Sequence, residues 1–257
     1  MTAHTLILRQ ENAQSETAAS PWQTIWKLGG TAALLILLTA LAEILITFLP
    51  GGYTTAETVT DWFALLQANP FLGLRNLGLL NMVMTALGIP LTFALYWAHR
   101  KVNAPFAALA LILALIGAAV FYATNRAFPM LALSAQYAAS SSQAERAMLE
   151  AAGQAMLAVG QSHTPGTFLA FFFSEIAGVL MAVVLLRGGL FKKAAALAGM
   201  IGYGFLLVFD VLSSFVPSTH AAILILAMIG GLSNLAWYVL VGLDLFRLGQ
   251  AEGRGAK

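Results

Sequence analysis

Long runs of apolar residues, separated by short polar connections, occupy most of the chain from residue 28 onward. An α-helix rises about 1.5 Å per residue and the hydrocarbon core of a bilayer is about 30 Å thick, so a span needs about 20 mainly apolar residues. Five runs meet this length and a sixth is compatible with it: Leu28 to Leu49, Phe71 to Ala98, Pro105 to Asn125, Thr167 to Leu186, Ala194 to Phe215 and Ala221 to Leu245. The pattern predicts an all-α, polytopic transmembrane bundle of six spans. Pro90, inside the second and longest run, predicts a kink there.

Composition supports this class, because 60% of the residues are hydrophobic, 9% are charged and the mean hydropathy is +0.82. The spans and their connections use nearly all 257 residues, which leaves no room for a separate soluble domain. The predicted organisation is a polar, disordered tail over residues 1–20, a membrane domain over 21–248 and a second tail over 249–257.

Lys and Arg are distributed unevenly between alternate connections, and such residues are retained on the cytoplasmic side during insertion. With the N-terminus inside, ten of the thirteen lie on the inner side: Arg9, Lys27, Arg100, Lys101, Arg187, Lys192, Lys193, Arg247, Arg254 and Lys257. The outer side has three: Arg75, Arg126 and Arg146. The sequence therefore predicts a multi-pass protein of a cell inner membrane with both termini in the cytoplasm.

Two outer connections match the capping box, in which a hydroxyl and a carboxylate three residues later satisfy free N–H groups at a helix start. Thr54 to Glu57 predicts a short helix that ends at Asn69, and Ser142 to Glu145 predicts one that runs to about Val159. These helices are expected to lie on the outer membrane surface or to cover the bundle. Shielding of the helix ends is the favoured role, because loop helices commonly do only that.

Ionisable residues within apolar runs are expensive in hydrocarbon unless they face a partner or water, so they are candidates for a functional site. Five such residues come from five different runs: Glu43, Arg75, Arg126, Glu175 and Asp210. Helix geometry places four of them roughly 7–12 Å below the outer boundary, with Arg126 at that surface. Further hydrogen-bonding groups at similar depth are Asn76, Asn81, Asn125 and Ser174.

Two interpretations of this polar group stay open. Interhelical ion pairs that fix helix rotation are the favoured one, and we expect at least two of Glu43, Glu175 and Asp210 to lie within reach of Arg75 or Arg126. The alternative is a pocket, in which the arginine fork would suit a carboxylate or phosphate and an acid would relay protons.

A stripe of small residues recurs at helical spacing in the fifth run, at Ala194, Ala198 and Gly202, with Gly199 beside it. Small residues let helix backbones approach closely, so the stripe predicts tight helix packing rather than chemistry.

Enzyme signatures are missing: the chain has no zinc-binding His-Glu-x-x-His helix, no Gly-x-Ser-x-Gly elbow and no Walker loop. The absence of cysteine excludes disulfides, thiolate nucleophiles, iron–sulfur clusters and cysteine-bound zinc. His163 and His220 lie in outer loops, where a shared metal site is less favoured than incidental positions because neither has a second ligand at helical spacing. We expect no catalytic residues, metal, cofactor or nucleic-acid partner; the expected partners are the lipid bilayer and, in one interpretation, a small polar or charged ligand.

Three segments resemble bacterial membrane proteins grouped as domain of unknown function 4386: Leu91 to Asn103, Phe171 to Glu175 and Leu185 to Gly202. The resemblance covers roughly residues 28–248 and implies a membrane protein of six or seven helices. It implies no activity and no catalytic residues.

Two functions remain open from the sequence. One is binding or transport of a small polar or charged solute through an outward-facing polar pocket. The other is a structural or accessory role in which the intramembrane charges only hold the bundle together.

Overall fold

The computed structural model describes residues 21–49, 52, 56–160, 162–216 and 220–255, and this part of the chain consists of helices and short connections, without a strand. Six segments have the length and apolar character to cross a membrane. They contain the helices α2 (Pro21–Phe48), α5 (Leu79–His99), α6 (Ala104–Thr124), α9 (Phe168–Gly188), α10 (Lys193–Phe215) and α11 (His220–Gly255). The predicted all-α bundle with six spans is confirmed. The helix α11 continues through Gly255, into the segment expected as a tail.

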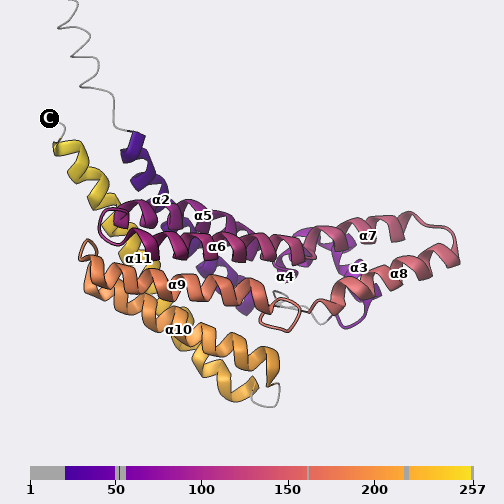
Figure 1. The fold of residues 1–257 in the computed structure, drawn as a ribbon. Helices are drawn as coiled ribbons and strands as arrows, with labels where there is room; N and C mark the ends of the chain where they lie inside the picture. The colour runs from indigo at the N-terminus through magenta and orange to yellow at the C-terminus, as the bar shows by residue number, and fades with distance from the viewer. Residues whose placement is uncertain (1–20, 50–51, 53–55, 161, 217–219, 256–257) are drawn as a thin grey trace, which may run out of the picture.

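The six long helices form a ring. Each contacts the next in the cyclic order α2, α5, α6, α9, α10, α11 and back to α2. The start of α2 and the end of α11 lie together at one end of the bundle, which we call the termini end (Figure 1). At the opposite end, α7 (Ala127–Ala139) continues beyond α6 and α8 (Gln143–Ala158) runs back beside it (Figure 1). We call this the cap end.

The second and third apolar runs differ from the prediction. The second contains two helices, the short α4 (Pro70–Asn76) and then α5, because Gly78 adopts a left-handed backbone conformation (φ 100°) that interrupts the helix. Pro90 lies inside the continuous α5. The third run extends through α7, so that the apolar stretch covers Ala104–Ala139, and α7 was not expected as a helix.

The helices α3 (Val59–Ala68), α7 and α8 pack together as a cap with its own small core. The core residues come mainly from α3 and α7: Val59, Trp62, Phe63, Leu66, Leu77, Ala127 and Met130. Gly153 of α8 lies against Val59 and Phe63, where a larger side chain would collide with the phenyl ring. The cap is therefore a packed unit rather than a set of loose loop helices.

Of the two predicted cap helices, one starts at its expected capping box and the other does not. The hydroxyl of Ser142 accepts from the Glu145 backbone N–H, and α8 follows as expected. The first helix begins later than expected, at Val59, because Thr58 and Asp61 form the capping box instead. Thr54 lies outside the described residues, and Glu57 precedes the helix.

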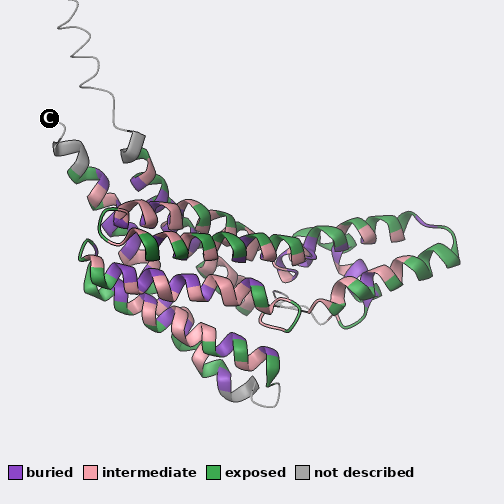
Figure 2. Cartoon of the chain, viewed as in Figure 1, coloured by how far each residue is buried: buried purple, intermediate pink, exposed green. Residues whose placement is uncertain are grey.

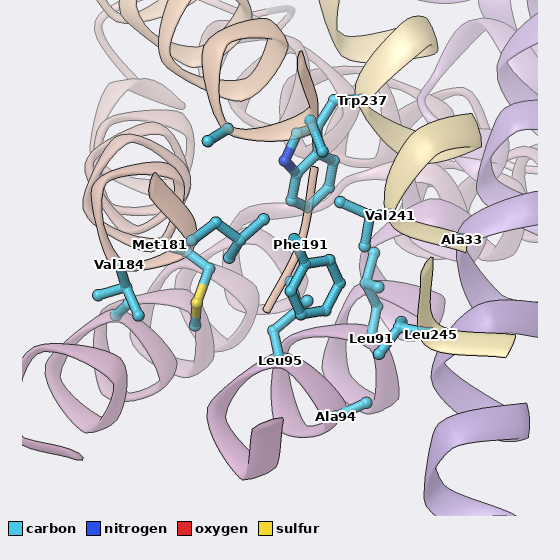
Figure 3. Packing of buried hydrophobic residues seen from close by; sticks show 14 of the residues in the cluster. Ala33, Leu91, Ala94, Leu95, Met181, Val184, Phe191, Trp237, Val241 and Leu245 are labelled. Atoms are coloured by element: carbon cyan, nitrogen blue, oxygen red, sulfur yellow. The ribbon is translucent and has the colours of Figure 1, made fainter. Parts of the chain in front are cut away.

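The main hydrophobic core fills the termini end of the ring. Figure 3 shows Leu91 and Leu95 of α5 facing Met181 of α9 and Val241 of α11, with Phe191 between them. All of these side chains are at most 5% exposed. The ring is therefore closed by apolar packing at this end.

The outside of the ring is apolar and exposed, as a lipid-facing surface should be. Large exposed side chains recur along the long helices, for example Leu38, Leu45, Ile112, Ile201 and Leu232. Figure 2 shows exposed positions along the outer faces of the bundle and over the ends of α7 and α8 that lie farthest from it. Such a surface belongs in a bilayer, and the protein is a multi-pass membrane protein.

Close packing in the predicted small-residue stripe is confirmed between α10 and α11. A Cβ atom added to Gly199 would lie 2.7 Å from the indole of Trp237, and one added to Gly202 would overlap the amide of Asn234. These glycines therefore let α11 place large or polar side chains directly against the α10 backbone.

Candidate functional site

The sequence-predicted polar residues are divided by the structure between two neighbouring cavities near the cap end. Residues around the first, which we call the arginine cavity, include Glu43, Arg75, Asn76, Asn81, Asn125 and Arg126. Residues around the second, the central cavity, include Asn81, Ser174 and Glu175. Asp210 lines neither cavity and is fully buried.

Arg75 and Glu43 form a pair in which the guanidinium is saturated. Its Nε and Nη2 atoms lie 3.0 and 2.8 Å from the two carboxylate oxygens of Glu43. Its remaining N–H groups donate to the carbonyls of Gly52 and Glu43, to Asn76 Oδ1 and to the Thr47 hydroxyl. A guanidinium has five N–H donors, and this one has a partner for each. The pair therefore ties the end of α2 to α4.

Glu175 and Asp210 pair with a histidine instead of an arginine. The imidazole Nδ1 of His163 lies 3.1 Å from Asp210 Oδ1 and 4.0 Å from Glu175 Oε1. Both residues are at most 4% exposed, and each carboxylate keeps one buried oxygen without a hydrogen-bond partner in the described part of the chain. Two acids of neighbouring helices, α9 and α10, thus converge on one imidazole.

His163 reaches this position from the connection between α8 and α9. Its backbone is left-handed (φ 58°), which is uncommon for a residue with a side chain, although histidine is among those that adopt it. The ring lies between aromatic side chains, with centroids 4.1 Å from Phe171 and 5.0 Å from Phe209. The connection therefore folds into the helix ring and places the imidazole beside the acids.

The interpretation of His163 as an incidental loop residue is therefore wrong. No spacing along the chain marks it, because its partners lie 12 and 47 residues away and meet it only in the folded bundle. The side chain of His220 lies outside the described residues. Within the described ranges, no group of three or more His, Asp or Glu side chains is arranged to hold a metal ion.

The central cavity has a volume of about 310 Å³ and lies inside the ring, on the cap side of the hydrophobic core. Its walls come from α5, α6, α9, α10 and α11, together with His163. They are largely apolar, with polar groups at Asn81, Thr85, Thr92, His163, Ser174, Glu175, Tyr203, Asn234 and Tyr238. A concave, mainly apolar space with a few convergent polar groups is the usual form of a small-molecule site.

Six polar residues of this wall were not among the sequence candidates: Thr85, Thr92, His163, Tyr203, Asn234 and Tyr238. The hydroxyls of the two tyrosines lie 3.4 Å apart. Asn234 is 7% exposed and its Oδ1 has no hydrogen-bond partner among the described residues. The cavity extends far enough along α11 to include both Asn234 and Tyr238.

The arginine cavity has a volume of about 220 Å³ and lies between the ends of α2, α4 and α6 and the connection before α9. Asn81 and Phe121 line both cavities, so the two spaces share a wall. Arg126 is 6% exposed here, and its Nη1 donates to the Leu157 carbonyl at 3.2 Å.

The expected charge pairing is wrong. Of these three acids, only Glu43 forms an ion pair with an arginine, whereas Glu175 and Asp210 both face His163. Arg75 also lies in α4, before the membrane-spanning segment that starts at Leu79, and not inside a span as expected. The predicted single layer of charges is thus two separate groups.

Comparison of the chain with curated proteins and with solved structures found no match. Residues 31–242, well over half of the chain, match a family described as Domain of unknown function (DUF4386). The chain therefore belongs to the DUF4386 family, as the resemblance in its apolar segments indicated.

Proposed function

We propose that this protein binds a small polar solute that carries an amine or another hydrogen-bond donor, inside the membrane, in the central cavity. The observation that carries the proposal is Glu175, a carboxylate that lines the cavity while one of its oxygens has no hydrogen-bond partner among the described residues.

Charge balance in the cluster supports a cationic or protonated partner. Glu175 and Asp210 contribute two carboxylates, whereas His163 contributes at most one positive charge. Buried charges are tolerated when they are paired, so one further proton or one cationic group completes the neutralisation. The cluster therefore suits solute binding that is coupled to a proton.

Hydrogen bonding supports a ligand that donates. Two acceptors on the cavity wall, Glu175 Oε2 and Asn234 Oδ1, are buried without partners in the described part of the chain. An unfilled buried acceptor costs free energy that a donor from a bound molecule would recover. An ammonium group of a small amine has the matching chemistry.

A purely structural role accounts for the pair formed by Arg75 and Glu43. Arg75 and Glu43 fill each other's bonding capacity and act as an interhelical latch. Glu175 differs, because it lines the central cavity and its Oε2 accepts no hydrogen bond from the described residues. The structural alternative therefore fits the arginine pair but not the histidine cluster.

Orientation in a cell inner membrane follows from the charges. The described Lys and Arg residues outside the two polar groups lie mainly at the termini end, in the connections α5–α6 and α9–α10 and near the ends of α2 and α11. The positive-inside rule supports an orientation with the termini in the cytoplasm and the cap outside. In that orientation the central cavity faces the outer side, and the apolar core closes the inner side. For a transporter, this arrangement is the outward-facing form.

Access to the cavity is testable with single cysteines, since the chain has none of its own. Thr85→Cys and Ser174→Cys line the cavity, whereas Ala94→Cys is a control in the closed core. A membrane-impermeant methanethiosulfonate reagent added on the cap side should label the first two and not the third. Labelling of none of them would contradict an outward-facing cavity.

Binding is testable with ethylammonium as the probe and ethanol as its uncharged counterpart. Ethylammonium should raise the Tm of the purified protein, and Glu175→Gln should remove this rise while leaving the folded protein abundant. The control Glu150→Gln changes a cap carboxylate that bonds Tyr137 and should keep the rise. Equal responses of the wild type and Glu175→Gln would reject Glu175 as the ligand group.

A further inference from the structure

Arg126 is a buried cation for which the described residues provide no carboxylate. It is 6% exposed, and the one hydrogen bond that its guanidinium donates to them goes to the backbone carbonyl of Leu157. Arg75, on the same cavity, shows how this fold saturates a guanidinium when the role is structural. Because a charge buried without a counter-charge is costly, Arg126 needs a negative partner.

Asn76 provides a second unfilled donor in the same cavity. Its Oδ1 accepts from Nη1 of Arg75, which fixes the orientation of the amide. The opposite end of the amide, Nδ2, is buried and has no hydrogen-bond partner among the described residues. A buried N–H donor without an acceptor costs free energy, so this amide also calls for an acceptor.

The charges around the arginine cavity leave a net positive charge. Glu43 is engaged by both Nε and Nη2 of Arg75, and these two charges cancel. Arg126 remains as the uncompensated charge, with the hydroxyls of Ser162 and Thr167 also on the cavity wall. The cavity therefore combines a free positive charge with neutral polar groups.

We propose that the arginine cavity binds a small oxyanion, a carboxylate or phosphate group, between Arg126 and Asn76. The planar guanidinium fork matches the paired oxygens of either group, and a charge-assisted hydrogen bond is stronger than a neutral one. The volume of about 220 Å³ accommodates such a group. Its source is a free anion from the outer solution or the headgroup of an anionic lipid, because the cavity lies at the cap end of the spans.

This site does not rest on the function proposed for the central cavity. The two cavities share Asn81 and Phe121, but Glu175 and His163 do not line the arginine cavity. Failure of amine binding in the Glu175→Gln experiment would therefore leave the oxyanion site standing, and the reverse also holds.

The test compares two variants and a control. Arg126→Gln removes the charge, and Asn76→Asp keeps the oxygen that accepts from Arg75 but replaces the unfilled donor with a negative group. Asn76→Asp is nearly the same size, so it tests the site even if Arg126→Gln fails to fold. The control Arg146→Gln removes a cap arginine that bonds the Ser140 carbonyl outside the cavity.

The first measurement is the Tm of purified protein with inorganic phosphate or acetate against sodium chloride at equal ionic strength. The second is native mass spectrometry for phosphatidylglycerol that remains bound after purification. A free oxyanion is indicated if phosphate or acetate raises the Tm. The apparent affinity for the anion, taken from the concentration dependence of the Tm, should then fall at least tenfold in Asn76→Asp but not in Arg146→Gln. A lipid headgroup is indicated by retained phosphatidylglycerol that Asn76→Asp loses. If neither probe responds, or if Asn76→Asp responds like the wild type, the proposal is overturned.

Discussion

The imidazole of His163 lies 3.1 Å from the carboxylate of Asp210, although the two residues are 47 positions apart and one of them comes from a connection between helices. Asp210 is fully buried on α10, so the histidine provides its charge partner from outside the six spans. The two side chains join the α8–α9 connection to the interior of the bundle. Any movement of this connection would change the environment of both acids.

A double-mutant cycle should detect this contact directly. His163→Ala and Asp210→Asn should each destabilise the protein, and their combined effect should differ from the sum by about 2 kcal/mol, because they remove the same buried pair. Reversible unfolding in mixed micelles measures the three free energies of unfolding. The cycle of His163→Ala with Asp244→Asn, an acid near the end of α11 that bonds Lys192, is the control and should be additive within about 0.5 kcal/mol. Additivity of the first cycle would mean that the pair does not form.

The latch between Arg75 and Glu43 should be important for stability. Arg75→Lys keeps the charge but replaces the five N–H donors of a planar fork, which bond Glu43, Gly52, Asn76 and Thr47, by three donors on one nitrogen, so we expect a loss of about 3 kcal/mol in unfolding free energy. In contrast, Arg247→Lys changes a pair whose arginine side chain is 62% exposed and should cost less than about 1 kcal/mol. Thermal unfolding of the purified variants checks both values. Similar losses in both would show that Arg75 is not a special anchor.

Two glycines of α10 should respond differently to the same substitution. Gly202→Ala would place a methyl group on the amide of Asn234, so overpacking should cost about 1–3 kcal/mol. Nothing lies within 4 Å of the corresponding position at Gly204, and Gly204→Ala should be neutral or stabilise by up to about 1 kcal/mol. Unfolding free energies of the pair measure the difference. Equal values would contradict the close approach of α10 and α11.

The cap should weaken at low pH through Asp61. The side-chain hydrogen bond with Thr58, followed by a bond from the Thr58 backbone, lowers the pKa of this carboxyl below its ordinary value of 3.8. A carboxyl with a lowered pKa in the folded state contributes stability above its unfolded pKa and loses this contribution as the pH falls through the folded value. The Tm of the wild type should therefore exceed that of Asp61→Asn at neutral pH, and the gap should close below about pH 3.8. A gap independent of pH would exclude this carboxylate as its cause.

Topology is testable with reporter fusions. Ten Lys and Arg residues on one side against three on the other predict that Lys257 is cytoplasmic and that the segment from Ser140 to Ser142 is external. Fusions at these points should report opposite sides of the membrane. An external C-terminus would reverse the orientation and place the central cavity on the cytoplasmic side.

The cap helix α7 shows a limit of prediction from the local sequence pattern, because it was not predicted as a helix. Residues Ala127 to Ala139 are apolar enough to extend the preceding run, and the break between α6 and α7 is marked locally only by Asn125, whose Oδ1 accepts from the Ala127 N–H, and by Pro129 in the first turn of α7. Their role became visible only through the packing of Ala127 and Met130 against Trp62 and Phe63. Helix propensity describes a segment by itself and does not identify the helix, here α3, against which the segment packs.

The membrane class, the six spans and the close packing at Gly199 and Gly202 could be predicted from the residues alone, because length, apolar character and residue size act locally along each helix. The pairing of the charges became known only from the folded bundle. Depth along a helix follows from counting residues, but rotation about the helix axis and the path of a connection do not. For that reason Glu43 could be assigned to Arg75 or Arg126 with equal ease, and His163 could not be assigned to Glu175 and Asp210 at all. The contacts that define the two cavities arise from the ring of helices as a whole, and that ring is fixed by the packing of every span against its neighbours.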